Sequence, residues 1–228
     1  MDLNGKNIII TGGAGGIGAA TTHLLLESGA NIGVVDNNSD SLWTLKKSLS
    51  SYPENRVNFY SIHIGQFDLV VQTVNMFFSR YGSIDGLINN AAILKDGPLI
   101  SISKGEFKKY SLSDWDETIT SNLNGYFYFT REVVEKMITK RTRGVIINVS
   151  SISAAGNMGQ TSYAATKAAV NALTVSWAQE LATFGIRVAG LSPGITDTQM
   201  PRSSMNEMLL NQWVIKTHLK RMADPKEM

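Results

Sequence analysis

The chain has 228 residues, of which 43% are hydrophobic and 18% charged, and its formal net charge is +2 at pH 7. This length suffices for one sizeable hydrophobic core, so we expect a single domain over residues 1–228. The small net charge gives no reason to expect nucleic acid or an anionic membrane as a partner. The chain has no cysteine, and its three histidines show no metal-ligand spacing, so we expect neither disulfides nor a bound metal.

The first residues of the chain are few and polar, unlike those of a signal peptide. No apolar run is long enough to cross a bilayer. We therefore expect a cytoplasmic protein that does not enter membranes.

Short apolar, β-branched runs alternate with segments of helical periodicity. The strand candidates are residues 7–11, 31–36, 57–62, 84–89, 145–150 and 186–191. The helical segments between them include residues 17–28, 41–49, 67–81 and 163–183. This alternation predicts an α/β fold, a doubly wound parallel sheet with helices on both faces.

Residues 93–113 interrupt the alternation. Two short alternating runs flank Lys104 and Gly105, which predicts a small β-hairpin inserted before the next helix. We interpret the lysines of this insertion as a solvated face and not as a binding patch.

A glycine-rich turn, residues 11–18, links the first strand to the first helix. Glycines let the backbone turn tightly and approach a diphosphate, which then lies at the positive end of the helix. The turn predicts a dinucleotide-binding loop, whose cofactor-binding residues are Gly12, Gly15, Gly16, Ile17 and Gly18.

Asp36 ends the second strand, and Asn37 follows it as a further cofactor-binding candidate. A carboxylate at this point can accept hydrogen bonds from both ribose hydroxyls of NAD, and it would repel a 2′-phosphate. No lysine or arginine occurs between Thr11 and Leu45 to neutralise that phosphate. We therefore expect NAD(H) in preference to NADP(H), although Asp36 could also be a simple turn residue.

Tyr163 and Lys167 are four residues apart, which places both side chains on one face of a helix. An ammonium beside a phenol favours the phenolate and lowers the tyrosine pKa, so the pair can handle a substrate proton. Taken alone, the pair also fits two ordinary surface neighbours.

Several motifs occur in order along the chain: Thr11–Gly18, Asn89–Ala92, Asn122, Asn148–Ser151, Tyr163 with Lys167, and Pro193–Gly194. Together they resemble the short-chain dehydrogenase/reductase family over nearly the whole chain. The closest likeness is to the branch that includes 3-oxoacyl-acyl-carrier-protein reductases. The resemblance implies a Rossmann-type fold and hydride transfer between a nicotinamide cofactor and a small-molecule carbonyl or secondary alcohol, such as a 3-oxoacyl thioester or a related ketone.

The resemblance also implies a role for each matching residue. Tyr163 would be the acid/base, and Lys167 would lower its pKa and bind the nicotinamide ribose. Ser151 would hydrogen-bond the substrate oxygen, and Asn122 would hold a water of the proton relay. The remaining implied cofactor-binding residues are Ile64, Asn90, Ala91, Ala92, Pro193, Gly194, Thr196 and Thr198.

Which serine is catalytic depends on the strand register. The side chains of Ser150 and Ser151 point to opposite faces, so only one can meet Tyr163. In the family pattern the tyrosine comes 13 residues after the catalytic serine, whereas Tyr163 comes 12 residues after Ser151 and 13 after Ser150. We choose Ser151, because strand register constrains the position more than loop length does.

Residues 195–220 form a helix-like segment that in the family would cover the substrate. The family pattern continues beyond this point with a further helix and a last strand. We therefore expect the last edge strand to be missing from this chain, either because the sequence is a truncated portion or because the protein omits the element. Omission would leave the preceding strand as an unpaired edge.

Two further questions concern catalysis and assembly. The fold could be retained in a non-catalytic dinucleotide sensor, although the presence of all four catalytic residues favours an enzyme. We expect a homo-oligomer, a dimer or tetramer, formed through an exposed stripe of Ala, Val and Trp177 on the helix at residues 161–182. The same stripe could instead face the protein's own sheet.

Overall fold

Six strands form one parallel sheet at the centre of the structure, in the order β3-β2-β1-β4-β7-β8. The structure is a computed structural model that describes residues 2–204 and 206–228. The strands of this sheet are β1 (Asn7–Thr11), β2 (Asn31–Asp36), β3 (Val57–Ser61), β4 (Gly86–Asn89), β7 (Val145–Val149) and β8 (Arg187–Leu191).

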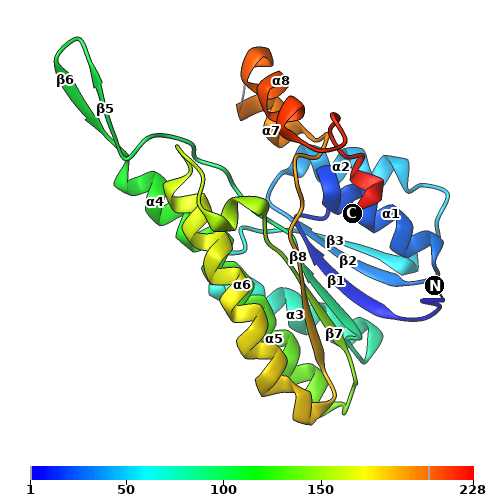
Figure 1. The fold of residues 1–228 in the computed structure, drawn as a ribbon. Coiled ribbons are helices and arrows are strands. Elements are labelled where there is room, and N and C mark those ends of the chain that lie inside the picture. The colour runs from blue at the N-terminus through cyan, green and yellow to red at the C-terminus, as the bar shows by residue number, and fades with distance from the viewer. Residues whose placement is uncertain (1, 205) are drawn as a thin grey trace.

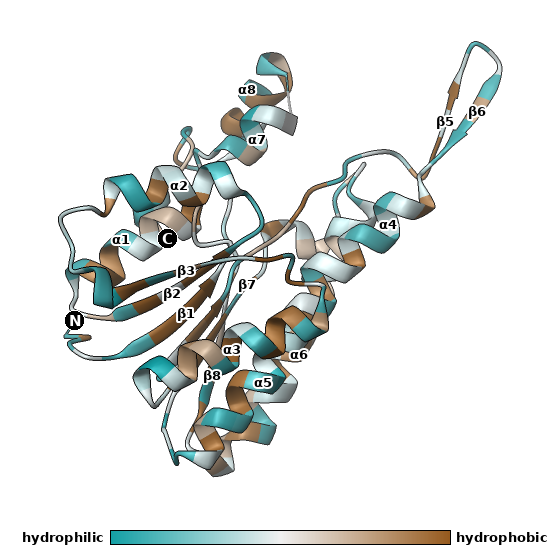
Figure 2. Ribbon diagram, turned by 180° about the vertical axis from the view of Figure 1, so that it is seen from behind, coloured by the Kyte–Doolittle hydropathy of each residue, from teal (hydrophilic) through white to brown (hydrophobic). Residues whose placement is uncertain are grey.

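Helices cover both faces of the sheet (Figures 1 and 2). The helices are α1 (Gly16–Glu27), α2 (Ser39–Ser48), α3 (Phe67–Tyr81), α4 (Leu112–Ile119), α5 (Gly125–Thr139), α6 (Thr161–Leu181), α7 (Gln199–Ser204) and α8 (Glu207–Lys216). The short helical turns are η1 (Glu54–Arg56), η2 (Thr120–Asn124), η3 (Ile152–Ala155), η4 (Ala182–Phe184) and η5 (Pro225–Glu227).

Strand alternation divides the core into two layers. Ile8 and Ile10 of β1 pack with leucines of α1 and α2 on one face. Ile9, between them, packs on the other face with residues of α3, α5 and α6. Successive side chains of a strand point to opposite faces, so a continuous apolar strand supplies both layers. The structure confirms the predicted doubly wound α/β fold.

The start of β4 differs from the sequence prediction. The strand begins at Gly86 instead of at residue 84. Asp85 uses its carboxylate to accept hydrogen bonds from the Asn7 amide at 3.0 Å and from Lys6 Nζ at 3.2 Å. These contacts hold the residue that precedes β4 against the start of β1.

The predicted hairpin is present and projects far from the body of the molecule (Figures 1 and 2). Its strands β5 (Ile100–Ser103) and β6 (Glu106–Lys109) are antiparallel. Lys104 and Gly105 make the turn with φ values of 52° and 83°. Residues 99–110 are called the arm below.

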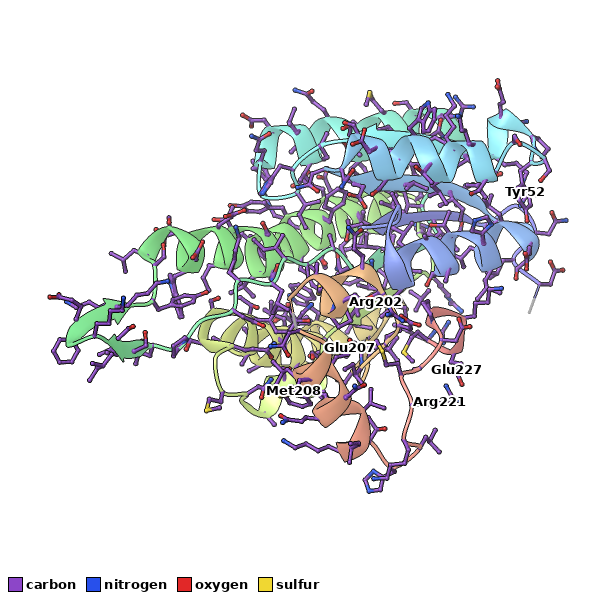
Figure 3. All side chains as sticks on the ribbon, turned by 90° about the horizontal axis from the view of Figure 1, so that it is seen from above. Tyr52, Arg202, Glu207, Met208, Arg221 and Glu227 are labelled. Carbon is purple, nitrogen blue, oxygen red and sulfur yellow. The ribbon has the colours of Figure 1, made fainter. Side chains whose placement is uncertain are left out.

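The C-terminal part of the chain lies over the carboxyl ends of the strands, where α7 and α8 lie above the sheet (Figure 1). An isolated bridge between Thr196 and Ala223 holds its two ends together. Arg221 and Glu227 lie side by side near the terminus (Figure 3), where they form an ion pair of 2.6 Å. Of the predicted covering segment 195–220, Met205 lies outside the described residues.

Strand β8 is at the edge of the sheet, and none of the described strands pairs with its outer side. Its side chains are exposed or half-buried along its whole length. No helix among the described residues has the length and apolar character that spanning a membrane requires.

The placement of Trp177 in an exposed stripe is wrong. Its side chain is only 9% exposed and packs in the core with Leu181 and Val188. Val175, on another face of α6, is 59% exposed. Apolar residues of α6 are spread around the whole helix, so their spacing alone did not indicate which face meets the sheet.

Candidate active site

One cavity of about 560 Å³ lies at the carboxyl ends of the strands. This is where open α/β sheets bind their ligands. Most of the predicted site residues line it: Gly12, Gly15, Gly16, Ile17, Asp36, Asn37, Ile64, Asn90, Ala91, Ala92, Ser151, Tyr163, Lys167, Pro193, Gly194, Thr196 and Thr198. Two predicted site residues, Gly18 and Asn122, do not line the cavity.

Close packing explains why the turn before α1 needs glycine. A Cβ on Gly18 would overlap the carbonyl oxygen of Gly12, and a Cβ on Gly12 would meet Ala91 Cα at 2.7 Å. Asn90 braces the same turn, because its Nδ2 donates to the carbonyl oxygens of Thr11 at 3.1 Å and Gly12 at 2.9 Å. Side chains larger than hydrogen would separate the turn from the segment that follows β4.

The N-terminus of α1 opens toward the cavity. Gly15 is its N-cap and has no side chain to accept the first amide hydrogens, and the first turn contains no acidic residue. A Cβ on Gly15 would meet no protein atom within 4 Å. Amide donors at the positive end of a helix, beside open space, fit the diphosphate of a dinucleotide.

Asp36 occupies the far end of this cofactor side. Its Oδ2 accepts from the Ala14 amide at 3.2 Å and its Oδ1 from the Asn38 amide at 3.0 Å. Among the described residues that line the cavity, Lys167 alone has a lysine or arginine side chain. The Asp36 carboxylate therefore faces the cavity with no cation of these types nearby, an arrangement that fits a ribose diol.

The two serines after β7 separate as strand alternation requires. Ser150 is buried, and its Oγ donates to the Lys167 carbonyl oxygen at 3.0 Å. Ser151 lines the cavity together with Tyr163, and it lowers the pKa of the Tyr163 phenol. Ser151 Oγ also accepts from the Ser153 amide at 3.1 Å, so its own hydrogen is available to donate.

Burial dominates the electrostatics of Tyr163. It raises the pKa of the phenol above its usual value, the Ser151 hydrogen bond lowers that pKa, and the Asp96 carboxylate raises it. The structure therefore does not show the lowered Tyr163 pKa that the tyrosine–lysine pair predicts. The main reason is the burial of the phenol, and the Lys167 ammonium bonds to Val149 and Tyr126 instead of to the Tyr163 hydroxyl.

Lys167 is 1% exposed, and its Nζ donates to the Val149 carbonyl oxygen at 2.7 Å and to the Tyr126 hydroxyl at 3.2 Å. Its Nζ lies 5.6 Å from the centre of the Tyr163 ring. Burial lowers the Lys167 pKa to about 7. The Lys167 ammonium is thus held at the buried side of the cavity, next to the ring of Tyr163.

Tyr126 is a site residue that the sequence analysis missed. It is fully buried, and its hydroxyl donates to the Val149 carbonyl oxygen at 3.1 Å while accepting from Lys167. A signal was present, because Tyr126 follows Asn122 by one helical turn, as Lys167 follows Tyr163.

Asn122 lies in η2, a stretch of π-helix between α4 and α5. Its side chain is fully buried and braces the loop after β4: Oδ1 accepts from the Ile93 amide at 2.8 Å, and Nδ2 donates to the Ile93 carbonyl oxygen at 2.9 Å. Single π turns inside helices occur frequently at functional sites.

A profile of the short chain dehydrogenase family matches residues 6–209. The chain belongs to this family. It is therefore an oxidoreductase of the short-chain dehydrogenase type, whose members bind a nicotinamide dinucleotide.

Individual relatives agree with this assignment. The 3-oxoacyl-acyl-carrier-protein reductase of Thermotoga maritima is 40% identical over 201 residues, 88% of this chain and 78% of that protein. The solved structure of levodione reductase matches with a TM-score of 0.90 and 28% identity, over 98% of this chain and 87% of the other. An NAD+-bound xylitol dehydrogenase matches with a TM-score of 0.87 and 26% identity, over 100% and 90%.

The cavity of this short-chain dehydrogenase also has a largely apolar side near Tyr163. Leu94, Ile152 and Trp213 line it, together with the amides of Asn157 and Gln160. None of these residues was identified individually from the sequence, because they come from loops, from η3 and from α8, whose positions depend on the fold. No cluster of potential metal ligands occurs among the described residues.

Proposed function

We propose that the protein catalyses hydride transfer between NAD(H) and the carbonyl or secondary alcohol of a 3-oxoacyl thioester or a related ketone. The observation that carries this proposal is the meeting of Ser151, Tyr163 and Lys167 in the same cavity as the open N-terminus of α1. The bound nicotinamide supplies or accepts the hydride. No observation favours a sensor without turnover.

In the reducing direction, Tyr163 would donate its phenolic proton to the substrate oxygen as that oxygen gains negative charge. Ser151 would orient the substrate oxygen, since its Oγ accepts from the Ser153 amide and its hydroxyl hydrogen can donate toward Tyr163 and the substrate. Lys167 would favour the phenolate that remains. In the oxidising direction the same three groups would act in reverse.

The side-chain amide of Asn122 is buried and uses both its oxygen and its nitrogen to hold Ile93. We therefore propose that Asn122 assists proton movement through its backbone and not through its amide. The wider π turn of η2 interrupts the regular pattern of helical hydrogen bonds, which allows a main-chain oxygen to accept a water.

We propose NAD(H) as the cofactor because of Asp36. A 2′-phosphate would meet a carboxylate that already accepts two amide hydrogens, with no lysine or arginine side chain on that side of the cavity. Repulsion between the 2′-phosphate and the Asp36 carboxylate would therefore disfavour NADP(H). A relative that reduces 3-oxoacyl groups does not by itself decide the cofactor of this chain.

The substrate class follows from the lining near Tyr163. Apolar side chains such as Ile152 and Trp213 suit an acyl chain or a ketone. No arginine of the described residues lines the cavity, so the phosphate of a phosphorylated sugar would find no guanidinium partner there. In keeping with its family, we further propose a cytoplasmic homo-oligomer.

A turnover screen tests the proposal. Purified protein would be assayed with 3-oxoacyl thioesters, simple ketones and polyols, each with NADH and NADPH or their oxidised forms. We expect reduction of 3-oxoacyl thioesters or ketones with NADH, and a relaxed cofactor preference in Asp36→Ala. A strong NADPH preference of the unaltered protein would contradict the assignment of Asp36.

Matched variants separate catalysis from binding. Tyr163→Phe should bind NADH normally and lose turnover, and Ser151→Ala should lose most of it. Ser150→Ala, one residue away, removes a hydrogen bond to α6 and should retain most of its activity if it folds. Near-normal turnover of Ser151→Ala would refute the assignment of this serine, and NADH binding without turnover on any substrate would favour a sensor.

A further inference from the structure

The arm has one apolar and one polar face. The strand register pairs Ile100 with Lys109 and Ile102 with Phe107, and directly paired residues point to the same side. Ile100, Ile102 and Phe107 therefore share one face, with Lys109 at its end. Ser101, Ser103, Glu106 and Lys108 share the other face.

The apolar face of the arm is uncovered within the chain. Ile100, Ile102 and Phe107 are 54%, 66% and 69% exposed. A two-stranded hairpin is marginally stable in water unless an apolar face packs on another element. Figures 1 and 2 show the arm from opposite sides, and in both views none of the described elements lies beside it.

The base of the arm is firmly attached beside the active site. The Gly97 amide donates to the Gly159 carbonyl oxygen at 2.7 Å. The Tyr110 hydroxyl donates to the Lys95 carbonyl oxygen at 2.7 Å and lies 2.7 Å from Ser162 Oγ. The base is thus joined to the segment that precedes Tyr163.

A second exposed apolar stripe lies immediately after the arm, on α4. Leu112 is 81% exposed and Trp115 is 36% exposed, and Asp116 is exposed beside them. Spacings of three and four residues place these side chains on one face of the helix. Neither Asp116 nor Lys109 forms an ion pair among the described residues, whereas Asp114 and Glu117 of α4 pair with Lys95.

We propose that the apolar face of the arm packs on the exposed stripe of α4 of a second copy of this chain. In a two-fold assembly each copy supplies both surfaces, so both arms and both stripes are covered at once. Ile100, Ile102 and Phe107 meet the partner's Leu112 and the partner's Trp115. Lys109 meets the partner's Asp116.

Length and charge favour this occupant. The four-residue strands are about 13 Å long, and the eight-residue helix is about 12 Å long. The arm carries three lysines and one glutamate, and Lys109 is the lysine at the end of its apolar face. Of the three acidic residues of α4, Asp116 is the one that does not pair with Lys95 in the described structure. An anionic membrane would match the lysines but would leave the stripe on α4 exposed.

Sedimentation velocity of the full chain tests the assembly. The unaltered protein should sediment as a dimer or larger assembly. Ile102→Glu with Phe107→Glu should dissociate it, with a dissociation constant raised by about tenfold or more. Ser101→Glu with Ser103→Glu, the same change on the polar face, should leave it intact. Unchanged assembly of the first variant, or a monomeric unaltered protein, would overturn the proposal.

A charge exchange tests the partner surface. Lys109→Glu and Asp116→Lys should each weaken the assembly, because each places like charges opposite one another. Together they should restore it, because the two charges have then changed places across the interface. Failure of the combined variant to recover would exclude this pairing. Binding of monomers to vesicles of anionic lipid, without self-association, would identify a membrane instead and refute the proposal.

The absence of cysteine permits a direct check. Oxidation of the Lys109→Cys, Asp116→Cys variant should give a covalent dimer on a non-reducing gel. Lys108→Cys with Asp116→Cys, on the opposite face of the arm, is the control and should give little. Equal yields from the two pairs would count against the proposed face. All variants lie outside the core, so a thermal unfolding curve shows whether each is folded.

Discussion

Replacing Lys167 by methionine should abolish turnover and stabilise the fold. The ammonium is almost completely buried, and burial lowers its pKa from 10.5 to about 7. Methionine has a similar length and carries no charge. The Val149 carbonyl oxygen keeps its hydrogen bond from the Tyr126 hydroxyl at 3.1 Å, so the substitution leaves no buried polar group without a partner there.

The magnitude follows from the pKa shift and its sign. The unfolded chain binds the Lys167 proton up to about pH 10.5, whereas the folded chain releases it near pH 7. Stability therefore rises with pH between these values, and the cost of burying the charge is fully present below pH 7. A shift of this size corresponds to about 5 kcal/mol, and the lost hydrogen bonds reduce the expected gain to about 3 kcal/mol.

Urea unfolding followed by tryptophan fluorescence provides the assay, because Trp177 lies in the core. From pH 7 to pH 9.5, the stability advantage of Lys167→Met should shrink by about 3 kcal/mol. Lys46→Met, at an exposed position of α2, is the matched control and should show no such change. If Lys167→Met is less stable than the unaltered protein at pH 7, or if its advantage is independent of pH, the reasoning fails.

Two further predictions concern groups around the site. Tyr126→Phe keeps the ring but removes the acceptor of Lys167 Nζ, so the Lys167 pKa should fall further; the alkaline limb of the rate–pH profile should move to lower pH while NADH binding persists. Gly18→Ala should weaken NADH binding and cost about 1–3 kcal/mol of stability, because its Cβ overlaps the Gly12 carbonyl oxygen. Gly15→Ala, where a Cβ meets no protein atom, should weaken NADH binding and leave the melting temperature unchanged; equal melting temperatures of the two variants would contradict this account.

Local patterns predicted most of the fold. β1, β2 and α3 have the predicted bounds. In each, a clear hydrophobic pattern ends at a residue that favours a turn or a helix end, such as Asp36 or Gly82. The bounds of β4 needed a contact distant in sequence, between Asp85 and Asn7. The face of α6 that meets the sheet needed the packing of the whole domain, which is why Trp177 was misplaced.

In the candidate site, too, some features followed from local sequence patterns and others depended on contacts distant in sequence. The residue types and their order predicted the lining of the cavity, because parallel strands bring their carboxyl ends together. The directions of the polar side chains were not predictable. Whether Lys167 points to Tyr163 or to Val149 depends on a hydroxyl supplied by α5, and the amide of Asn122 is used by a loop 29 residues earlier.

The π turn of η2 lies next to both of these polar contacts. Asn122, inside the turn, holds the loop after β4 through both atoms of its amide. Tyr126, one turn later, holds Lys167 and the end of β7. The segment therefore positions two walls of the cavity with two side chains of one helical face. Asn122, Ser151 and the Tyr163–Lys167 pair come from three separate parts of the chain, and the segment from Asn122 to Tyr126 connects to these parts through Ile93, Val149 and Lys167.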